Sequence, residues 1–259
     1  MAFTKVDDNI IHYAWLNFGR DQNLVFVNSL GTSFLIWNQM IPSLSVDFNL
    51  LFHDKRGHGL SSSNNNSTTI DDYADDVIGV MDFCKIDSAH IVGLSIGGLV
   101  TYSLAHRFSD RCEKLIFSNT GTKIGNKEVW SERISQIKDQ GLAATAENVI
   151  DRWLSDDYKK QYPHATKGYR RMFELTDRKA YLNACNAIAE ADYSHVAGAL
   201  DHESLFLVGS EDIATPPDFV RQNAGLLPKA EFYEFEGVAH LPCIEAPEKV
   251  NDQIKTFLL

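Results

Sequence analysis

Short apolar runs alternate with helical patterns along most of the chain, and this alternation limits the folds that the chain can adopt. The runs occupy residues 23–28, 48–54, 89–93, 113–119, 205–209 and 231–236. Most of them group their apolar residues without strict alternation, which is typical of strands covered on both faces. Helical patterns occupy residues 70–83, 97–108, 217–227 and 247–258. Repeated strand and helix units predict an α/β fold with a mostly parallel sheet and helices on both faces.

The start and the middle of the chain depart from this alternation. Segments 3–6 and 10–18 read as two further strands in an edge hairpin, which brings the predicted sheet to about eight strands. The polar stretch 61–69 is predicted to be a loop. Between 121 and 198 no strand is predicted, and helical patterns occupy residues 128–139, 143–154, 169–175 and 179–191. We therefore expect a core domain of residues 1–120 and 199–259, with a helical lid, 121–198, inserted over the carboxyl edge of the sheet.

The sequence GLSIG, residues 93–97, lies where an apolar run changes into a helical pattern. It matches G-x-S-x-G, the pattern of a nucleophile elbow, in which a sharp turn between strand and helix lifts a serine hydroxyl above the sheet. The glycines permit the tight turn, and the helix N-terminus favours developing negative charge. A glycine-rich turn with a packing serine is the structural alternative. The context predicts that Ser95 is a nucleophile.

A serine nucleophile needs a base, and the base needs a group that orients it. Among nine histidines, His240 is the best placed, because it lies in the turn between the last predicted strand and the terminal helix. His58 could also approach the site, although a turn-stabilising role is favoured for it. Glu211 and Asp212 follow another strand, and Asp212 is preferred because the stiff proline-containing segment after it would fix its direction. The order Ser95, Asp212, His240 is that of the α/β-hydrolases.

The tetrahedral intermediate of acyl transfer needs two hydrogen-bond donors that form an oxyanion hole. We predict that the N–H of Ile96, the residue after the nucleophile, is one of them. The other comes from the loop NSLGTSF, where we predict the Leu30 N–H, with Gly31 giving the backbone room. A plain glycine turn is the structural alternative for this loop.

Composition argues against several other classes of protein. A net charge of -11 and a pI near 5.2 argue against a nucleic-acid partner, which needs clustered Lys and Arg. The four cysteines lie far apart without a C-x-x-C pair, so we expect buried reduced thiols rather than a metal site or a disulfide scaffold. No uncharged stretch is apolar enough to span a membrane, and the first residues lack a signal-peptide pattern. We expect a cytoplasmic protein with no membrane partner and no cofactor.

Nearly the whole chain resembles the α/β-hydrolase superfamily and, more narrowly, the 3-oxoadipate enol-lactonases of aromatic catabolism. The resemblance rests on NSLGTSFLIW, DKRGHGLS, GLSIGG, SNTGTKIG with VWSERI, GSEDIATPP and HLPCIEAPEKV. GLSIGG and RGHG are common to the superfamily, whereas NSLGT, SNTGTKIG and VWSERI are similar to the lactonases. The chain departs from the lactonase pattern at Gly121-Thr122, where two alanines are expected.

The resemblance implies a carboxylic ester hydrolase that opens 3-oxoadipate enol-lactone to 3-oxoadipate through an acyl-enzyme, in the β-ketoadipate pathway. A protein of charge -11 repels this small anionic lactone at long range, so a cation in the cleft must hold it. Arg133, in the segment VWSERI, can grip a carboxylate through two hydrogen bonds. A surface ion pair with Glu128 or Glu132 is its structural alternative. The other candidates are Lys123, Arg152, Arg170 and Arg171.

Two tryptophans in the predicted lid, Trp130 and Trp153, could form the apolar wall of the pocket, and the lid core is their structural alternative. Two other functions remain open for the whole chain. The same triad could act on another small ester, a C–C bond or a perhydrolytic substrate, because a fold does not select among these reactions. A ligand-binding receptor on a hydrolase scaffold is the non-enzymatic alternative, and the intact Ser95, Asp212 and His240 favour the enzyme.

Overall fold

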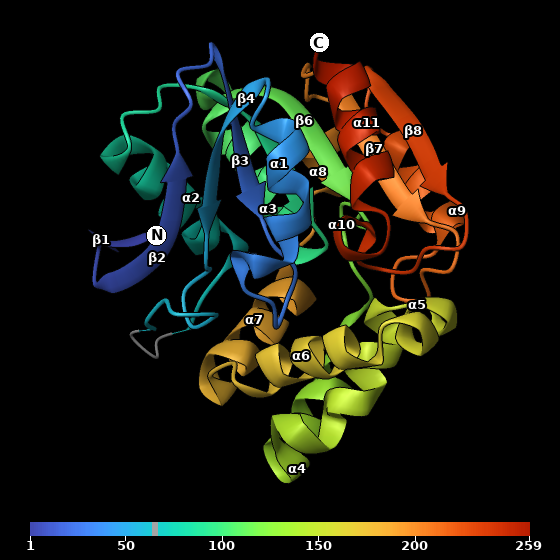
Figure 1. The fold of residues 1–259 in the computed structure, drawn as a ribbon. Coiled ribbons are helices and arrows are strands. Elements are labelled where there is room, and N and C mark those ends of the chain that lie inside the picture. Colours follow the sequence, from blue (N-terminus) through green and yellow to red (C-terminus); the bar gives the residue numbers. More distant parts are fainter. Residues whose placement is uncertain (64–66) are drawn as a thin grey trace.

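One eight-stranded sheet forms the centre of the protein, in the order β1-β2-β4-β3-β5-β6-β7-β8 (Figure 1). The computed structural model describes residues 1–63 and 67–259, so part of the loop predicted at 61–69 lies outside the described residues. The strands are β1 (Ala2–Val6), β2 (Asn9–Leu16), β3 (Gln22–Val27), β4 (Phe48–His53), β5 (Ala89–Leu94), β6 (Cys112–Ser118), β7 (Ser204–Gly209) and β8 (Ala230–Phe235). β1 and β2 form an antiparallel edge hairpin, and β3 to β8 run parallel. The predicted mostly parallel sheet of about eight strands with an edge hairpin is confirmed.

The central strands are buried along their whole length, which explains their unbroken apolar runs. Every residue of β4, β5 and β7 is buried, as expected for parallel strands covered on both faces. Aromatic pairs bridge neighbouring strands: the ring centroids of Phe26 and Phe52 are 4.8 Å apart, and those of Phe117 and Phe206 are 4.7 Å apart. These contacts fix the positions of the strand ends that carry the site.

Helices cover both faces of the sheet. In Figure 1, α1 and α11 lie on one face, and α2 and α3 lie on the other. The core helices are η1 (Phe34–Met40), α1 (Ile41–Leu44), α2 (Ile70–Phe83), α3 (Ile96–Arg107), η2 (Ser109–Arg111), α9 (Pro217–Ala224), α10 (Pro242–Glu245) and α11 (Pro247–Leu258). α2 begins where predicted because Thr69 and Asp72 form a capping box, in which the Asp72 N–H donates to Thr69 Oγ1 over 3.1 Å.

A helical block lies between β6 and β7. It contains α4 (Lys127–Trp153), α5 (Asp156–Gln161), α6 (Pro163–Glu174), α7 (Arg178–Glu190) and α8 (Ser194–Ala197). The two helices predicted at 128–139 and 143–154 are the two arms of α4, which is kinked at Gly141 (φ 79°). Figure 1 shows α4, α6 and α7 gathered beyond one end of the sheet.

Cysteine pairing, membrane-spanning helices and metal-binding groups can be examined in the described residues. All four cysteines are free, and Cys112, Cys185 and Cys243 are buried. Cys84 is only half-buried, so the expectation of buried thiols is wrong for this residue. Within residues 1–63 and 67–259, no helix has the length and apolar character needed to cross a bilayer, and no group of three or more His, Cys, Asp or Glu could hold a metal ion.

Candidate active site

Ser95 occupies a strained turn between β5 and α3. Its backbone angles, φ 58° and ψ -116°, lie in a region that residues other than glycine rarely adopt, at a typical cost of about 1 to 3 kcal/mol. Two hydrogen bonds hold this turn in place. The Ser95 N–H donates to the Ser118 carbonyl over 2.9 Å, and Thr120 Oγ1 donates to the Ser95 carbonyl over 2.8 Å. This is the geometry of a nucleophile elbow.

The glycines around Ser95 allow backbone segments to approach closely. A Cβ atom on Gly97 would overlap the carbonyl oxygen of Val27, at the end of β3. A Cβ atom on Gly93 would overlap the carbonyl of Gly97, and one on Gly98 would overlap the side chain of Thr120. The GLSIGG stretch therefore packs the start of α3 directly against the ends of β3 and β6.

Asp212 and His240 meet in the loops that follow β7 and β8. Asp212 Oδ2 accepts a hydrogen bond from His240 Nδ1 over 2.8 Å, and both side chains are buried. Asp212 Oδ2 also accepts from Asn119 Nδ2 over 2.8 Å and from Thr215 Oγ1 over 2.6 Å. The neighbouring carboxylate of Glu211 is exposed, so the structure brings Asp212, as preferred from the sequence, to the imidazole.

The surroundings of Asp212 hold this carboxyl in its charged form. Burial alone would raise its pKa, but the charge of His240 and the hydrogen bonds from His240, Thr215 and Asn119 outweigh burial, so the pKa of Asp212 lies below its ordinary value. The charged Asp212 favours the tautomer of His240 that carries its proton on Nδ1. The other ring nitrogen, Nε2, is then free to accept a proton.

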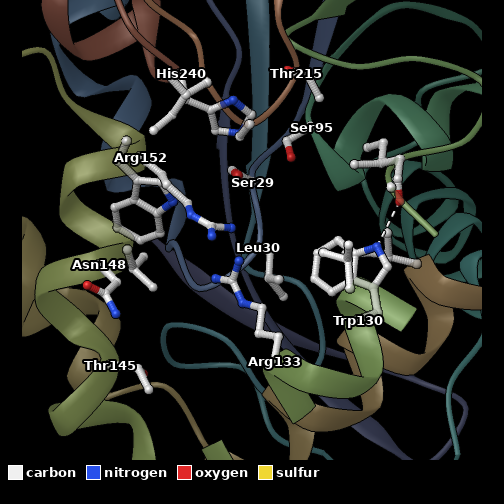
Figure 2. A pocket seen from close by; sticks show the side chains of 18 of the residues that line it. Ser29, Leu30, Ser95, Trp130, Arg133, Thr145, Asn148, Arg152, Thr215 and His240 are labelled. Atoms are coloured by element: carbon white, nitrogen blue, oxygen red, sulfur yellow. Dashed lines mark hydrogen bonds between the residues drawn. The ribbon is translucent and has the colours of Figure 1, made fainter. Parts of the chain in front are cut away.

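Ser95 and His240 line one cavity of about 570 Å³. Figure 2 shows the Ser95 hydroxyl and the His240 ring at the same end of this pocket, beside Ser29 and Thr215. Asp212 lies behind the imidazole, so the three groups predicted from distant parts of the sequence converge at one rim of the sheet. A hydroxyl, a base and an acid in this order can perform nucleophilic acyl transfer.

The loop after β3 lies beside the elbow and forms part of the pocket wall. Leu30 lines the pocket, and Gly31 has the positive φ of 75° that favours glycine. A Cβ atom on Gly31 would also lie 2.8 Å from the Phe173 ring. Among the described residues, no backbone hydrogen bond outside the helices and strands engages the N–H of Leu30 or of Ile96, as an oxyanion hole formed by these two groups requires.

Arg133 lies inside the pocket rather than on the surface. Its guanidinium donates a hydrogen bond to the Tyr181 hydroxyl and lies 5.5 Å from the Trp130 ring centroid. These contacts, and not an ion pair with Glu128 or Glu132, hold the side chain. An aromatic frame leaves the positive charge of Arg133 available to an anion.

Arg152, from the second arm of α4, is a second cation in the pocket. Figure 2 shows the guanidinium groups of Arg133 and Arg152 pointing toward one another. Partial burial, and then the positive charge of Arg133, lower the pKa of Arg152. Two facing cations repel one another, so a carboxylate between them would be stabilised by both.

Lys123, the second candidate for substrate binding, is not brought into the pocket. Its ammonium group forms an exposed ion pair with Asp192 over 3.0 Å. Arg170 and Arg171 also pair with carboxylates outside the pocket, both with Glu174. The prediction for Lys123 is therefore corrected, because a tertiary ion pair directs its side chain away from the cavity.

The two tryptophans serve both of the roles considered for them. Trp130 and Trp153 line the cavity, and both are also buried in the helical block. Trp130 Nε1 donates to the Ile124 carbonyl over 2.7 Å, which fixes one indole, and Trp153 packs edge-on against Phe173. The apolar wall of the pocket is thus also part of the core of the block.

Three supporting residues were not found from the sequence: Asn119, Thr215 and Tyr181. Asn119 lies at a positive φ of 50°, which asparagine tolerates better than most residues, and its amide then reaches Asp212. The only signals were positional: Asn119 is the last residue of the strand predicted at 113–119, and Thr215 lies in the proline-containing segment after the strand predicted at 205–209. His58 is buried in its turn, with Nδ1 3.2 Å from the Arg56 carbonyl, and does not line the pocket.

The departure at Gly121-Thr122 lies outside the pocket lining. Thr122 N–H and Oγ1 both donate to Asn223 Oδ1 of α9, over 2.8 and 2.9 Å. A Cβ atom on Gly121 would overlap Phe219 and Asn223. This dipeptide therefore anchors the start of the helical block to the core.

Comparisons with known proteins agree with the fold. The model of the alpha/beta hydrolase family matches residues 24–253, and the chain belongs to this family. It is 30% identical over 208 residues to 3-oxoadipate enol-lactonase 2 of Acinetobacter baylyi, a match that covers 80% of this chain and 78% of the relative. The crystal structure of the enol-lactonase from Burkholderia xenovorans superposes with a TM-score of 0.96 at 33% identity, covering 99% of each chain.

A hydrolase from Pseudomonas aeruginosa superposes with a TM-score of 0.93 at 25% identity, covering 99% of this chain and 97% of that protein. Family, fold and relatives together define the chain as a hydrolase.

Proposed function

We propose that this hydrolase opens the ring of 3-oxoadipate enol-lactone to give 3-oxoadipate, through an acyl-enzyme on Ser95. His240 acts as the base and Asp212 orients it. The N–H groups of Leu30 and Ile96 stabilise the oxyanion. Residues 121–198 act as a lid that supplies the substrate-binding cations. The steps use only side chains and backbone groups of this chain, together with water.

The acylation step follows from this arrangement. His240 Nε2 takes the proton of Ser95 Oγ, which attacks the lactone carbonyl carbon. The oxyanion then collapses, the ring C–O bond breaks, and the enol oxygen leaves with the proton carried by His240. The released enol tautomerises to the ketone while its carbon chain stays bound to Ser95 as an ester.

In the second step His240 takes a proton from water, and the hydroxide attacks the ester carbonyl. The bond to Ser95 Oγ breaks, and the proton returns from His240 to Ser95. The product is the open-chain dicarboxylate.

One observation supports this substrate above a neutral ester: the pocket that holds Ser95 and His240 also holds Arg133, framed by aromatic rings, with Arg152 facing it. A cationic pocket in a protein of charge -11 is suited to a small anion. One charge-assisted hydrogen bond contributes about 1.5 to 3 kcal/mol net, which corresponds to a roughly tenfold to hundredfold preference for the anionic substrate.

The substrate is tested by comparing kcat/KM for 3-oxoadipate enol-lactone with kcat/KM for a neutral acetate ester. We expect the lactone to be favoured by at least about tenfold, and Arg133→Leu to remove most of this margin. Lys123→Leu is the matched control, because Lys123 lies outside the pocket, and it should leave the margin unchanged.

Equal kcat/KM values for the two substrates in the wild-type enzyme would rule out the lactone as the substrate. If the wild-type margin is present and Arg133→Leu does not change it, Arg152 takes over the role of the binding cation. Arg152→Leu should then remove the margin.

A further inference from the structure

A buried lysine lies beneath the proposed oxyanion loop. Lys55 follows β4 and is fully buried. Its ammonium group donates hydrogen bonds to the carbonyl oxygens of Asn28 and Ser29, each over 2.8 Å. Both carbonyls belong to the loop after β3, which lines the pocket at Ser29 and Leu30.

The Ser29 carbonyl and the Leu30 N–H belong to the same peptide group. The Ser29 oxygen also accepts from Thr32 Oγ1 over 2.8 Å and from the Thr32 N–H over 3.4 Å. Hydrogen bonds to a carbonyl oxygen draw electron density from the whole peptide group and make its N–H a stronger donor. A charged donor such as Lys55 Nζ has a larger effect than a neutral one.

The charges around Lys55 leave its ammonium group directed at these carbonyls. Among the described residues, no carboxylate accepts a hydrogen bond from Lys55 Nζ. The neighbouring Asp54 binds His12 Nδ1 over 2.7 Å and the N–H groups of Phe34 and Leu60. Burial lowers the pKa of Lys55 to about 7, and the charge of Asp54 acts in the opposite direction.

Among the described residues, His53 and His58 also interact electrostatically with Lys55. Burial, and then the positive charge of Lys55, lower the pKa of each imidazole to about 3. Both histidines are therefore neutral near pH 7. Of the three residues His53, Lys55 and His58, Lys55 is the one that can be a cation while it donates hydrogen bonds to the oxyanion loop. Burying an ammonium group is costly, so a merely structural clamp could be built from a neutral donor at lower cost.

We propose that Lys55 is a positioning residue that polarises the Ser29–Leu30 peptide and so strengthens the Leu30 N–H as a donor to the oxyanion. This inference rests on the proposed function, because it needs an oxyanion at that N–H. It assigns a catalytic contribution to a side chain that does not touch the substrate.

The first test is Lys55→Met, which keeps the length of the side chain and removes its charge. Loss of a whole oxyanion donor lowers kcat by about 10²- to 10³-fold, and loss of its polarisation should lower kcat by about tenfold, with KM changed less than about threefold. Lys114→Met is the matched control. Lys114 Nζ likewise donates to a backbone carbonyl, that of Phe257, over 3.0 Å, but away from the pocket, and its loss should leave kcat unchanged.

A spectroscopic readout separates polarisation from a structural role. In an acyl-enzyme formed with a slowly hydrolysed ester, the infrared stretch of the acyl carbonyl should move to higher frequency in Lys55→Met, because its oxygen has a weaker donor. In the wild-type enzyme, kcat should fall as the pH rises through the Lys55 pKa of about 7, and the folded variant should lack this fall.

The inference is overturned if folded Lys55→Met keeps kcat within about twofold of the wild type, or if its acyl carbonyl frequency is unchanged. If the variant does not fold, Lys55→Gln, which replaces the charged donor with a neutral one, takes its place, and a kcat within about twofold of the wild type then overturns the inference. Failure of the proposed function is distinguishable, because wild-type protein would then form no acyl-enzyme at Ser95.

Discussion

The replacement Asp212→Asn should inactivate the enzyme while leaving the fold in place. Asp212 Oδ1 accepts from two backbone N–H groups, those of Ala214 over 2.8 Å and Thr215 over 3.0 Å. These donors cannot rotate, so the amide oxygen of asparagine must take the Oδ1 position. The new NH₂ group then replaces Oδ2 and faces His240 Nδ1, which lies 2.8 Å away.

This substitution reverses the tautomer of His240. Nδ1 must now accept a hydrogen bond, so the ring proton moves to Nε2, the nitrogen that is needed to take the proton of Ser95. A change of this kind in a serine triad lowers kcat by about 10⁴-fold, which corresponds to about 5.4 kcal/mol of activation free energy. The loss should be in kcat and not in KM, because Arg133 and the pocket walls are unchanged.

The assay is steady-state hydrolysis of the enol-lactone and of a chromogenic acetate ester, with folding checked by thermal unfolding. Glu211→Gln is the matched control, because it makes the same chemical change at the adjacent exposed carboxylate and should keep full activity. Folded Asp212→Asn with more than about a tenth of the wild-type kcat would refute the assignment of Asp212.

Two further predictions concern stability. Gly97→Ala should abolish activity and destabilise the fold by about 1 to 3 kcal/mol or more, because the new Cβ atom overlaps the Val27 carbonyl. Gly168 lies within α6 and faces open space, so Gly168→Ala should stabilise the fold by about 0.5 to 1 kcal/mol. Both free energies of unfolding can be measured by chemical denaturation. Lys55 has a pKa of about 7 in the folded protein and 10.5 as its ordinary value, so the unfolded chain binds more protons between these pH values. The free energy of unfolding of the wild type minus that of Lys55→Met should therefore increase as the pH rises from about 7 to 10. A difference that stays constant over this range would contradict the shifted pKa of Lys55.

The sheet and most helices were predictable because their signals are local. The capping box of Thr69 and Asp72 set the start of α2, and the continuous apolar runs located six strands to within about one residue. Ser95, Asp212 and His240 were found because each follows a predicted strand, and the carboxyl ends of parallel strands meet at one edge.

The misplaced Lys123 and the residues that were missed depend on contacts between distant segments. Lys123 pairs with Asp192, 69 positions along the chain, and no local pattern predicts that contact. Tyr181 and Arg133 are 48 positions apart, so their hydrogen bond appears only once α4 and α7 pack together. The same holds for Lys55, whose position in the sequence gives no indication that it lies under the loop of Ser29.

The cooperation of Ser95 and His240 can be measured by the reaction of the protein with a serine-directed phosphonate, followed by intact mass and peptide mapping. Wild type should gain one covalent adduct, on Ser95, and Ser95→Ala should gain none. His240→Ala should react far more slowly, because the hydroxyl then lacks its base. Folded wild-type protein that stays unlabelled, or that is labelled at another residue, would contradict the proposed triad and favour a ligand-binding scaffold.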